Sequence, residues 1–373
     1  MTPQSGTCPQ CGSGPLDEIY GIDRIPVFQN KVYASAAQAR QAVCGPVSLL
    51  ACPGCGFVFN GRFDASLMSY DQDYQNEQSH SPVFDDYLDA IVDRLVAAGY
   101  QQKKVVEIGC GKGTFLNKLW QRGFDAIGFD TAYEGDDPRV HREYFSARHR
   151  GMSIDLVILR HTLEHIARPL DFLRDLAGHC PPRAGIYIEV PSFEWIIAKR
   201  AFWDVFFEHC NYFTQQSLGA MFATSSCDLL FGDQYMALLA PLGELLPRAR
   251  VPGSPDPMDL SVLAREIDVA RRFVRTHPGL LVWGAGAKGA TFVNITDPDC
   301  EFIKAVVDIN PKKTGRHVAG TGHPIIAAQQ IAATGATDVL IMNENYRAEI
   351  MAMAGSGKLR FHTLGVDSLS PAD

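Results

Sequence analysis

A glutamate and a histidine stand side by side in the aromatic stretch "DVFFEHCNYFT", residues 204–214. An unperturbed histidine has a pKa near ~6.5, so at cellular pH His209 is largely neutral and able to accept a proton. A base that removes a proton from carbon also requires donors that stabilise the negative charge formed. Equally, Glu208 and His209 can be a buried, hydrogen-bonded pair in an aromatic core. The two residues alone do not decide between these interpretations.

Two C-x-x-C pairs, Cys8 with Cys11 and Cys52 with Cys55, have the spacing of metal ligands. Two such pairs complete a tetrahedral thiolate site with Zn–S distances of ~2.3 Å. A closed site of this kind leaves no position for substrate, so the predicted Zn²⁺ is structural. Cys44 could substitute as a ligand, although a packing role is favoured. The alternative is two unrelated thiol pairs.

A glycine-rich loop follows the apolar run in "VVEIGCGKGTFL". Glycines let the backbone approach a ligand closely, and a helix N-terminus offers unpaired N–H groups. At the end of the next predicted strand, Asp130 can accept hydrogen bonds from both hydroxyls of a ribose. Arg160 and His161 close the strand "DLVILRH", and ligands bind at the carboxyl ends of parallel strands. The candidate cofactor-binding residues are Glu107, Gly109, Gly111, Gly113, Asp130 and Arg160, whereas His161 is assigned to packing beside the cofactor.

The elements that position these residues alternate between helical and strand patterns. Such alternation predicts βαβ units and a parallel sheet covered on both faces. A second series of the same kind begins with a long helix at residue 260, after the Pro- and Gly-rich segment 241–259. The fold class is therefore α/β, with a cysteine-bearing module in front. The predicted domains are residues 1–72, 73–246 and 247–373.

Length and charge narrow the class of protein. A chain of 373 residues suggests two or three domains. The net charge of −8 argues against a nucleic-acid partner. No apolar run approaches the ~18 residues of a membrane helix, and no secretory signal is visible. We expect a cytoplasmic protein without a membrane partner. In a reducing compartment, its 10 cysteines indicate metal binding or burial rather than disulfides.

A second glycine loop, "LLVWGAGAKG", has the spacing Gly284-x-Gly286-x-x-Gly289 and is followed by Asp308. This pattern fits a dinucleotide fingerprint and raises the alternative of an oxidoreductase that uses NAD. Too few residues follow for both halves of such a fold, so a Rossmann-like half-domain is expected. The loop could instead hold a substrate diphosphate through backbone N–H groups and Lys288, or serve as a scaffold turn.

Taken together, the motifs resemble those of class I S-adenosylmethionine (SAM) methyltransferases, and more closely the sugar C-methyltransferases of deoxysugar pathways. That family carries a zinc-binding module, a central SAM domain and a C-terminal α/β domain. The resemblance rests on "CPQC", "CPGCGFVFN", "YDQDYQNEQSHS", "VVEIGCGKG", "HTLEHI", "EHCNYF" and "GAGAKG".

The resemblance implies a reaction and a set of catalytic residues. A base removes the proton beside the ketone of a nucleotide-linked 4-keto deoxysugar, and the enolate takes the methyl group of SAM. His209 matches the base and Glu208 its neighbour in the pocket. His165 matches a second active-site histidine, and Tyr74 matches an aromatic residue near the zinc module.

One position departs from the family pattern. The family has a tyrosine three residues before the base, and Phe206 stands there in this chain. Tyr212 or Tyr74 could supply the missing hydroxyl, or the substrate could differ. The alternatives are a C-, O- or N-methyltransferase of another small metabolite, and a zinc-ribbon interaction protein with a degenerate SAM fold. We expect a small-molecule substrate, a role in secondary metabolism or surface-glycan biosynthesis, and a monomer or weak homodimer.

Overall fold

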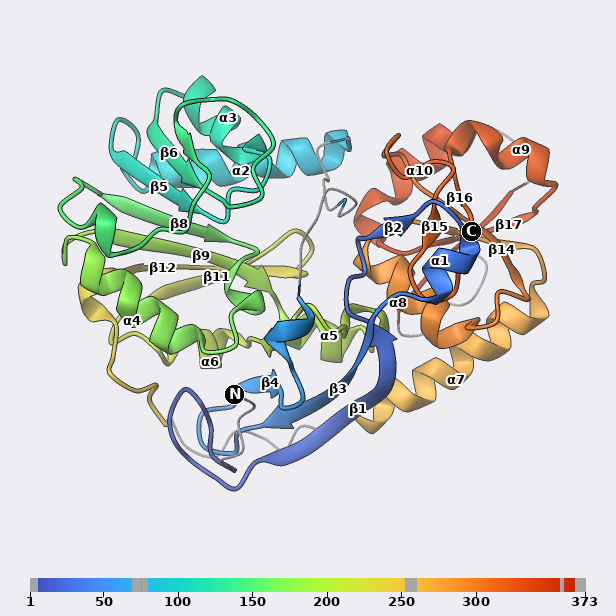
Figure 1. The fold of residues 1–373 in the computed structure, drawn as a ribbon, viewed down its shortest axis with the longest axis horizontal. Helices are drawn as coiled ribbons and strands as arrows, with labels where there is room; N and C mark the ends of the chain where they lie inside the picture. Colours follow the sequence, from blue (N-terminus) through green and yellow to red (C-terminus); the bar gives the residue numbers. More distant parts are fainter. Residues whose placement is uncertain (1–5, 69–74, 76–79, 252–259, 356–358, 366–373) are drawn as a thin grey trace.

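The computed structural model describes residues 6–68, 75, 80–251, 260–355 and 359–365. A central α/β domain and a C-terminal α/β domain lie beside each other, and the N-terminal segment runs beneath both (Figure 1). Within the described ranges, no helix is long and apolar enough to cross a bilayer.

The central domain is built on a sheet in the order β11-β12-β9-β8-β5-β6-β7. The pairs β9–β8, β8–β5, β5–β6 and β6–β7 are parallel, whereas β12 is antiparallel to both of its neighbours. This order, with one reversed strand near the edge, is that of the class I methyltransferase fold and confirms the predicted fold class. The strands are β5 (Lys104–Ile108), β6 (Asp125–Phe129), β7 (Val140–His141), β8 (Leu156–Arg160), β9 (Gly185–Pro191), β11 (Ser226–Leu230) and β12 (Tyr235–Pro241).

Alternate residues of each strand point to opposite faces of this sheet, and helices pack against both faces. Val105, Leu156 and Ile158 pack in one core cluster with residues of α2 and α3. Val106 and Val157 belong to a second cluster, which includes residues of α4 and α6. The helices are α2 (Pro82–Ala97), α3 (Thr114–Gln121), α4 (Pro169–His179), α5 (Phe193–Ala198) and α6 (Gln215–Gly219).

The C-terminal domain has a parallel sheet in the order β16-β14-β13-β17-β18. Strands lie on both sides of β13, so the sheet is wider than the single mononucleotide half that the residue count suggested. Its elements are α7 (Ser261–Thr276), β13 (Leu280–Trp283), α8 (Ala287–Thr296), β14 (Ile303–Val307), β15 (His317–Val318), β16 (Ile325–Ile326), α9 (Ile331–Thr334), β17 (Asp338–Ile341), α10 (Arg347–Ala354) and β18 (Arg360–Thr363).

The N-terminal segment does not form a separate body. Its antiparallel sheet, β1-β3-β4, is completed by β10 from the central part of the chain. Its short strand β2 pairs with β15 of the C-terminal domain. The elements are β1 (Asp17–Pro26), β2 (Val32–Tyr33), α1 (Ala36–Arg40), β3 (Cys44–Ala51), β4 (Val58–Asn60) and β10 (Asn211–Tyr212).

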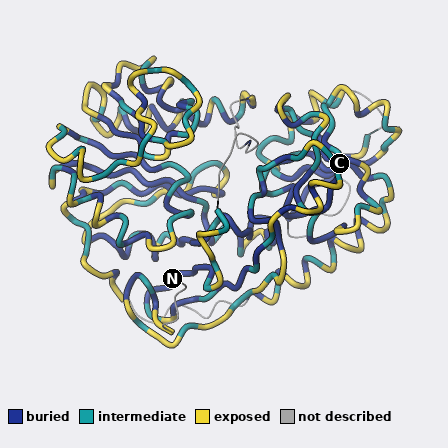
Figure 2. The backbone as a smooth tube through the Cα atoms, viewed as in Figure 1, coloured by how far each residue is buried: buried dark blue, intermediate teal, exposed yellow. Residues whose placement is uncertain are grey.

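The hydrophobic cores follow the same cross-connections. Ile25 and Val47 of the N-terminal sheet share a cluster with Val282 and Phe292 of the C-terminal domain. The cysteine end of the module instead packs with the central domain. Figure 2 shows buried segments in the central domain, in the C-terminal domain and in the N-terminal segment. The predicted borders at residues 72 and 246 remain a prediction.

Candidate functional site

A cavity of about 420 Å³ lies between the central domain, the C-terminal domain and the N-terminal segment. Its walls include the first glycine loop, the carboxyl end of β8, the loop after Trp203 and the second glycine loop. The structure thus brings together residues that the sequence placed far apart. The predicted site residues that line the cavity are Glu107, Gly109, Gly111, Arg160, His165, Glu208 and His209.

The first glycine loop has a backbone conformation that favours glycine. Gly109, Gly111 and Gly113 have φ values of 77°, 55° and 77°. A Cβ on Gly109 would lie 2.4 Å from Thr162 Oγ1, whereas a Cβ on Gly111 would meet no atom within 4 Å. Gly111 therefore presents bare backbone at the cavity, as a tightly held ligand requires.

Asp130 supports this loop from the end of β6. Its Oδ2 accepts a hydrogen bond from Gly111 N at 2.8 Å, and its Oδ1 accepts one from Ala132 N at 2.8 Å. Each carboxylate oxygen has two acceptor sites, so both oxygens can still accept from a ribose hydroxyl. Asp130 and Gly113 do not themselves line the cavity.

Glu107 and Arg160 both line the cavity. Glu107 is 2% exposed, and its Oε2 has no hydrogen-bond partner among the described residues. Burial raises the pKa of Glu107 to about 8. Arg160 donates two hydrogen bonds to Glu189, from Nε at 3.0 Å and from an Nη at 2.9 Å, and stacks on Phe115. Arg160 thus holds a buried carboxylate as well as lining the cavity.

His165 and His209 both line the cavity and contact each other. Their rings are edge to face, with centroids 4.9 Å apart. His165 Nδ1–H donates to the backbone carbonyl of Glu208 at 2.9 Å. The Glu208 carboxylate in turn accepts from Gln29 N at 2.7 Å. The base candidate is therefore held between the central domain and the N-terminal segment.

Burial lowers the pKa of His209 well below its usual value, and the nearby His165, His161 and Lys288 lower it further. The ring is therefore neutral at neutral pH and can accept a proton. Phe206 forms the adjacent wall, with ring centroids 4.1 Å apart. The position where the family has a tyrosine is thus an apolar contact of the base.

The two candidate hydroxyl donors do not fill that position. Tyr212 is 3% exposed and lies outside the cavity. Its hydroxyl accepts from Phe206 N and donates to Phe206 O, both at 3.1 Å. These bonds fix the loop before the base and correct the expectation that Tyr212 faces the substrate. Tyr74 lies outside the described residues.

The sequence reasoning missed Glu164 as a residue of the cavity, and it missed the partner of Lys288. Glu164 is 1% exposed and lies with His165 and His209 in a cluster whose ligand atoms are all within 4.8 Å of one another. Lys288 forms an ion pair with Asp204 across the interface between the central and C-terminal domains. The "LEHI" motif contains Glu164, but the pairing of Lys288 with Asp204 leaves no local sequence signal.

His161 directly follows β8 and contacts Glu164 of this cluster. Its Nδ1 is 3.4 Å from Glu164 Oε1, and its Nε2 is 3.1 Å from Glu189 Oε1. Although burial alone would lower it, these two carboxylates raise the pKa of His161 to about 9. His161 is therefore a charged residue of the cavity wall, in contrast to the packing role expected for it.

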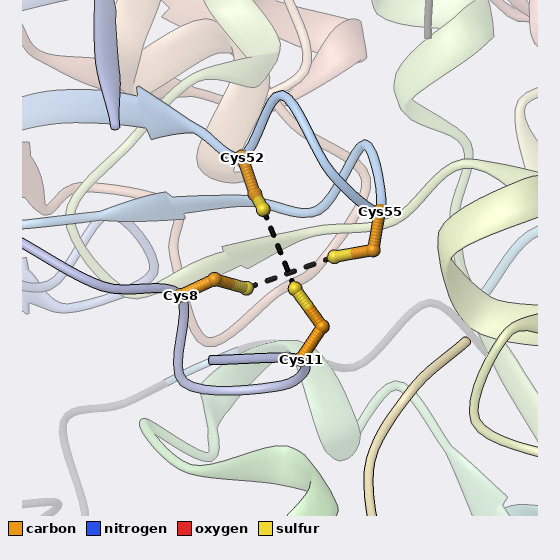
Figure 3. A group of neighbouring side chains, drawn as sticks. All are labelled: Cys8, Cys11, Cys52 and Cys55. Atoms are coloured by element: carbon orange, nitrogen blue, oxygen red, sulfur yellow. Dashed lines mark hydrogen bonds between the residues drawn. The ribbon is translucent and has the colours of Figure 1, made fainter. Parts of the chain in front are cut away.

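The two cysteine pairs converge as predicted (Figure 3). Cys8 Sγ lies 3.6 Å from Cys55 Sγ, and Cys11 Sγ lies 3.5 Å from Cys52 Sγ. A tetrahedral site with Zn–S bonds of ~2.3 Å has S–S edges of about 3.8 Å. Backbone N–H groups donate to Cys8 Sγ and Cys11 Sγ at 3.4 Å. The four buried thiols therefore fit a structural Zn²⁺, whereas Cys44 lies outside the cluster.

The second glycine loop faces the same cavity from the C-terminal domain. Asp308 does not project freely toward a ribose, because its Oδ2 accepts from Ala285 N at 2.8 Å and its Oδ1 accepts from Asn310 N at 2.8 Å. Lys313 Nζ donates to Ala285 O at 3.0 Å. The acid of the apparent dinucleotide fingerprint thus stabilises the loop itself.

Two family models match the chain. Residues 80–230 match a methyltransferase domain, and residues 267–358 match a C-methyltransferase C-terminal domain. The second match includes the glycine loop that raised the NAD alternative. Comparison with curated proteins gives no match.

Comparison with solved structures finds matches to part of the chain. A SAM-dependent methyltransferase from Archaeoglobus fulgidus is 17% identical, with 41% of this chain and 93% of that chain covered and a TM-score of 0.33. The magnesium protoporphyrin IX methyltransferase of Synechocystis is 16% identical, with 42% and 78% covered and a TM-score of 0.30. With such low scores, these likenesses add nothing to the family models about substrate or mechanism.

Proposed function

We propose that this SAM-dependent methyltransferase transfers a methyl group to carbon, beside the ketone of a nucleotide-linked 4-keto deoxysugar. The matched C-methyltransferase C-terminal domain supports carbon as the target. The observation that carries the proposal is the position of His209. It lies in the cavity lined by the first glycine loop, and burial keeps its ring neutral.

The cofactor side of the cavity fits SAM. Gly109 and Gly111 would lie against the cofactor, and Asp130 would accept hydrogen bonds from its ribose hydroxyls. Oε2 of Glu107, which has no hydrogen-bond partner among the described residues, offers a further acceptor. When bound, SAM supplies an electrophilic methyl group on a sulfonium ion.

His209 begins the reaction as a general base. It takes the proton from the carbon beside the ketone, and the C–H electron pair moves into the enolate. His165 packs against His209 and is oriented by its hydrogen bond to Glu208 O. Because the pKa of His209 is well below 6.5, the base is lost only when the pH falls through that lowered value. The proton-abstraction rate is therefore expected to be level through neutral pH.

The C-terminal loop is proposed to hold the diphosphate of the substrate. The N-terminus of α8 follows Gly286 and presents backbone N–H groups, which favour anions. Lys288 is already paired with Asp204. The backbone, rather than a free ammonium group, would thus make the main diphosphate contacts.

A second candidate is methyl transfer to carbon, oxygen or nitrogen of another small metabolite. The specific observation in its favour is Phe206, whose ring lies against His209 where a phenol would be expected. An apolar wall at this position suits a substrate that needs no hydroxyl donor there.

Solvent deuterium wash-in tests the proposal. The protein is incubated with nucleotide 4-keto sugars in heavy water without SAM, and exchange at the carbon beside the ketone is followed by mass spectrometry. We expect exchange that is lost in His209→Ala and retained in His277→Ala, whose histidine lies in the C-terminal domain outside the cavity. Unchanged exchange in His209→Ala would refute the base assignment. Methylation of another metabolite class without any sugar exchange would favour the second candidate.

The cysteine cluster is proposed to bind one structural Zn²⁺. The cluster lies at the end of the N-terminal sheet. In that sheet β4 pairs with β10, and β10 begins directly after His209 and Cys210. The ion would therefore stabilise the segment that presents the base, without contacting the substrate. Its closed set of four thiolates leaves no coordination position for catalysis.

A further inference from the structure

Glu164 is a buried carboxylate that has no role in the reaction proposed above. It lies in the 3₁₀ turn Leu163–His165, and its side chain is 1% exposed. Among the described residues, none donates a hydrogen bond to Oε1 or Oε2. Its contact in the structure is the ion pair with His161, at 3.4 Å. A buried carboxylate without hydrogen-bond donors is unfavourable unless a functional partner offsets it.

The cavity contains a candidate partner for Glu164, the ring of His209. A carboxylate oxygen of Glu164 and a ring nitrogen of each of His165 and His209 all lie within 4.8 Å of one another. The three side chains line the same cavity. Glu164 is thus the carboxylate of the cluster that contains the base, although it makes no hydrogen bond to His209 in this state.

The surroundings of His209 disfavour a positive charge. His161 follows the end of β8, His165 lies in the turn after it, and Lys288 lies on α8. The charges of these three residues act against a charge on His209. The acids on the neighbouring elements are already engaged, because Asp204 pairs with Lys288, Glu189 pairs with Arg160 and the Glu208 carboxylate accepts from Gln29 N. Proton transfer nevertheless places a full charge on the ring of His209.

We propose that Glu164 is a positioning residue that stabilises the imidazolium of His209 formed when the substrate carbon loses its proton. This inference rests on the proposed role of His209 as base. As the C–H bond breaks, its electron pair enters the enolate and the proton binds a ring nitrogen of His209. The charged ring then interacts with the Glu164 carboxylate. After methyl transfer to the carbon, His209 releases the proton to solvent.

The role of His161 follows from the same geometry. It lies between Glu164 and Glu189 and contacts a carboxylate through each ring nitrogen. Through these contacts, His161 holds the Glu164 side chain in the cluster. His161 therefore acts through Glu164 rather than on the substrate.

The test is the isosteric variant Glu164→Gln, with Glu301→Gln as a surface control. We expect wash-in to fall at least ~10-fold at neutral pH, because a weaker base removes the proton more slowly. We also expect the acid limb of the pH profile to move to lower pH, because the neutral amide no longer favours the charged ring. Glu164→Asp keeps the charge, so the acid limb of its pH profile should lie close to the wild-type position.

A second measurement separates this inference from the proposed function. The pKa of His209 is followed by NMR of histidine-labelled protein without substrate, with the signal assigned from His209→Ala. A lower pKa in Glu164→Gln supports the role of Glu164 even if no keto sugar exchanges. An unmoved pKa with a lower rate would show a merely structural role and overturn the inference. A loss of bound metal below wild type, with the cysteine cluster intact, would show that Glu164 is a metal ligand instead.

Discussion

The buried ion pair between Lys288 and Asp204 links the C-terminal domain to the central domain and leads to a quantitative prediction. The two side chains are 16% and 7% exposed, so water screens the pair little. Removing one partner of such a pair typically costs 3–5 kcal/mol, because the other charge stays buried without compensation. In Asp204→Asn, the amide oxygen can still accept a hydrogen bond, and Lys288 keeps its position 4.8 Å from the Trp195 ring centroid. We therefore expect a loss of about 2–4 kcal/mol in the free energy of unfolding.

The loss should depend on pH. Burial lowers the pKa of Lys288, while Asp204 opposes that shift. Without Asp204, the folded-state pKa falls further below that of the unfolded chain, so unfolding takes up a proton over a wider pH range. The stability of the variant then rises with pH across this range, and the deficit relative to wild type is larger at pH 7 than near pH 10.

Urea denaturation followed by tryptophan fluorescence at several pH values measures both effects. The matched control is Asp228→Asn, which removes an ion pair with Arg94 whose side chains are 45% and 56% exposed. That surface pair should contribute about 0–1 kcal/mol. A loss for Asp204→Asn no larger than for the control, or a deficit that does not change with pH, would refute the reasoning.

Other predictions concern the zinc site, the cofactor loop and the tyrosine beside the base. Purified protein should contain one zinc per chain, and Cys52→Ser should lower this value in metal analysis; equal zinc in both would contradict the site. Asp130→Ala should weaken SAM binding at least ~10-fold in calorimetry, because it removes the proposed ribose acceptor and the support of Gly111; unchanged affinity would refute this role. Tyr212→Phe should lower stability by ~1–3 kcal/mol, since the bonds to Phe206 are buried, while wash-in persists; wash-in lost at unchanged stability would instead indicate a catalytic hydroxyl.

Much of the fold could be predicted from the sequence because its signals are local. The apolar strands, the glycine loop after β5 and the alternation of helices with strands all lie within short windows, and they predict a doubly covered sheet. The two cysteine pairs likewise have a spacing that a metal imposes. The expected helix after residue 260 is α7, Ser261–Thr276.

The remaining features depend on contacts between distant segments. No local pattern predicts that β10 completes the N-terminal sheet or that β2 pairs with β15, because short strands are stabilised by their partners. The width of the C-terminal sheet was underestimated for the same reason, since β16 and β18 are short edge strands.

By itself, the sequence determined the enzyme class and the residue types at the site. The two glycine loops and the "EH" pair are each short, unbroken stretches of sequence, so they can be recognised without the fold. Only the tertiary structure decided what each side chain does. It bonds Tyr212 to the backbone of Phe206, away from the cavity, and it places Glu164 beside His209. The physical reason is that burial and partners, rather than residue type, set the charge and availability of a side chain.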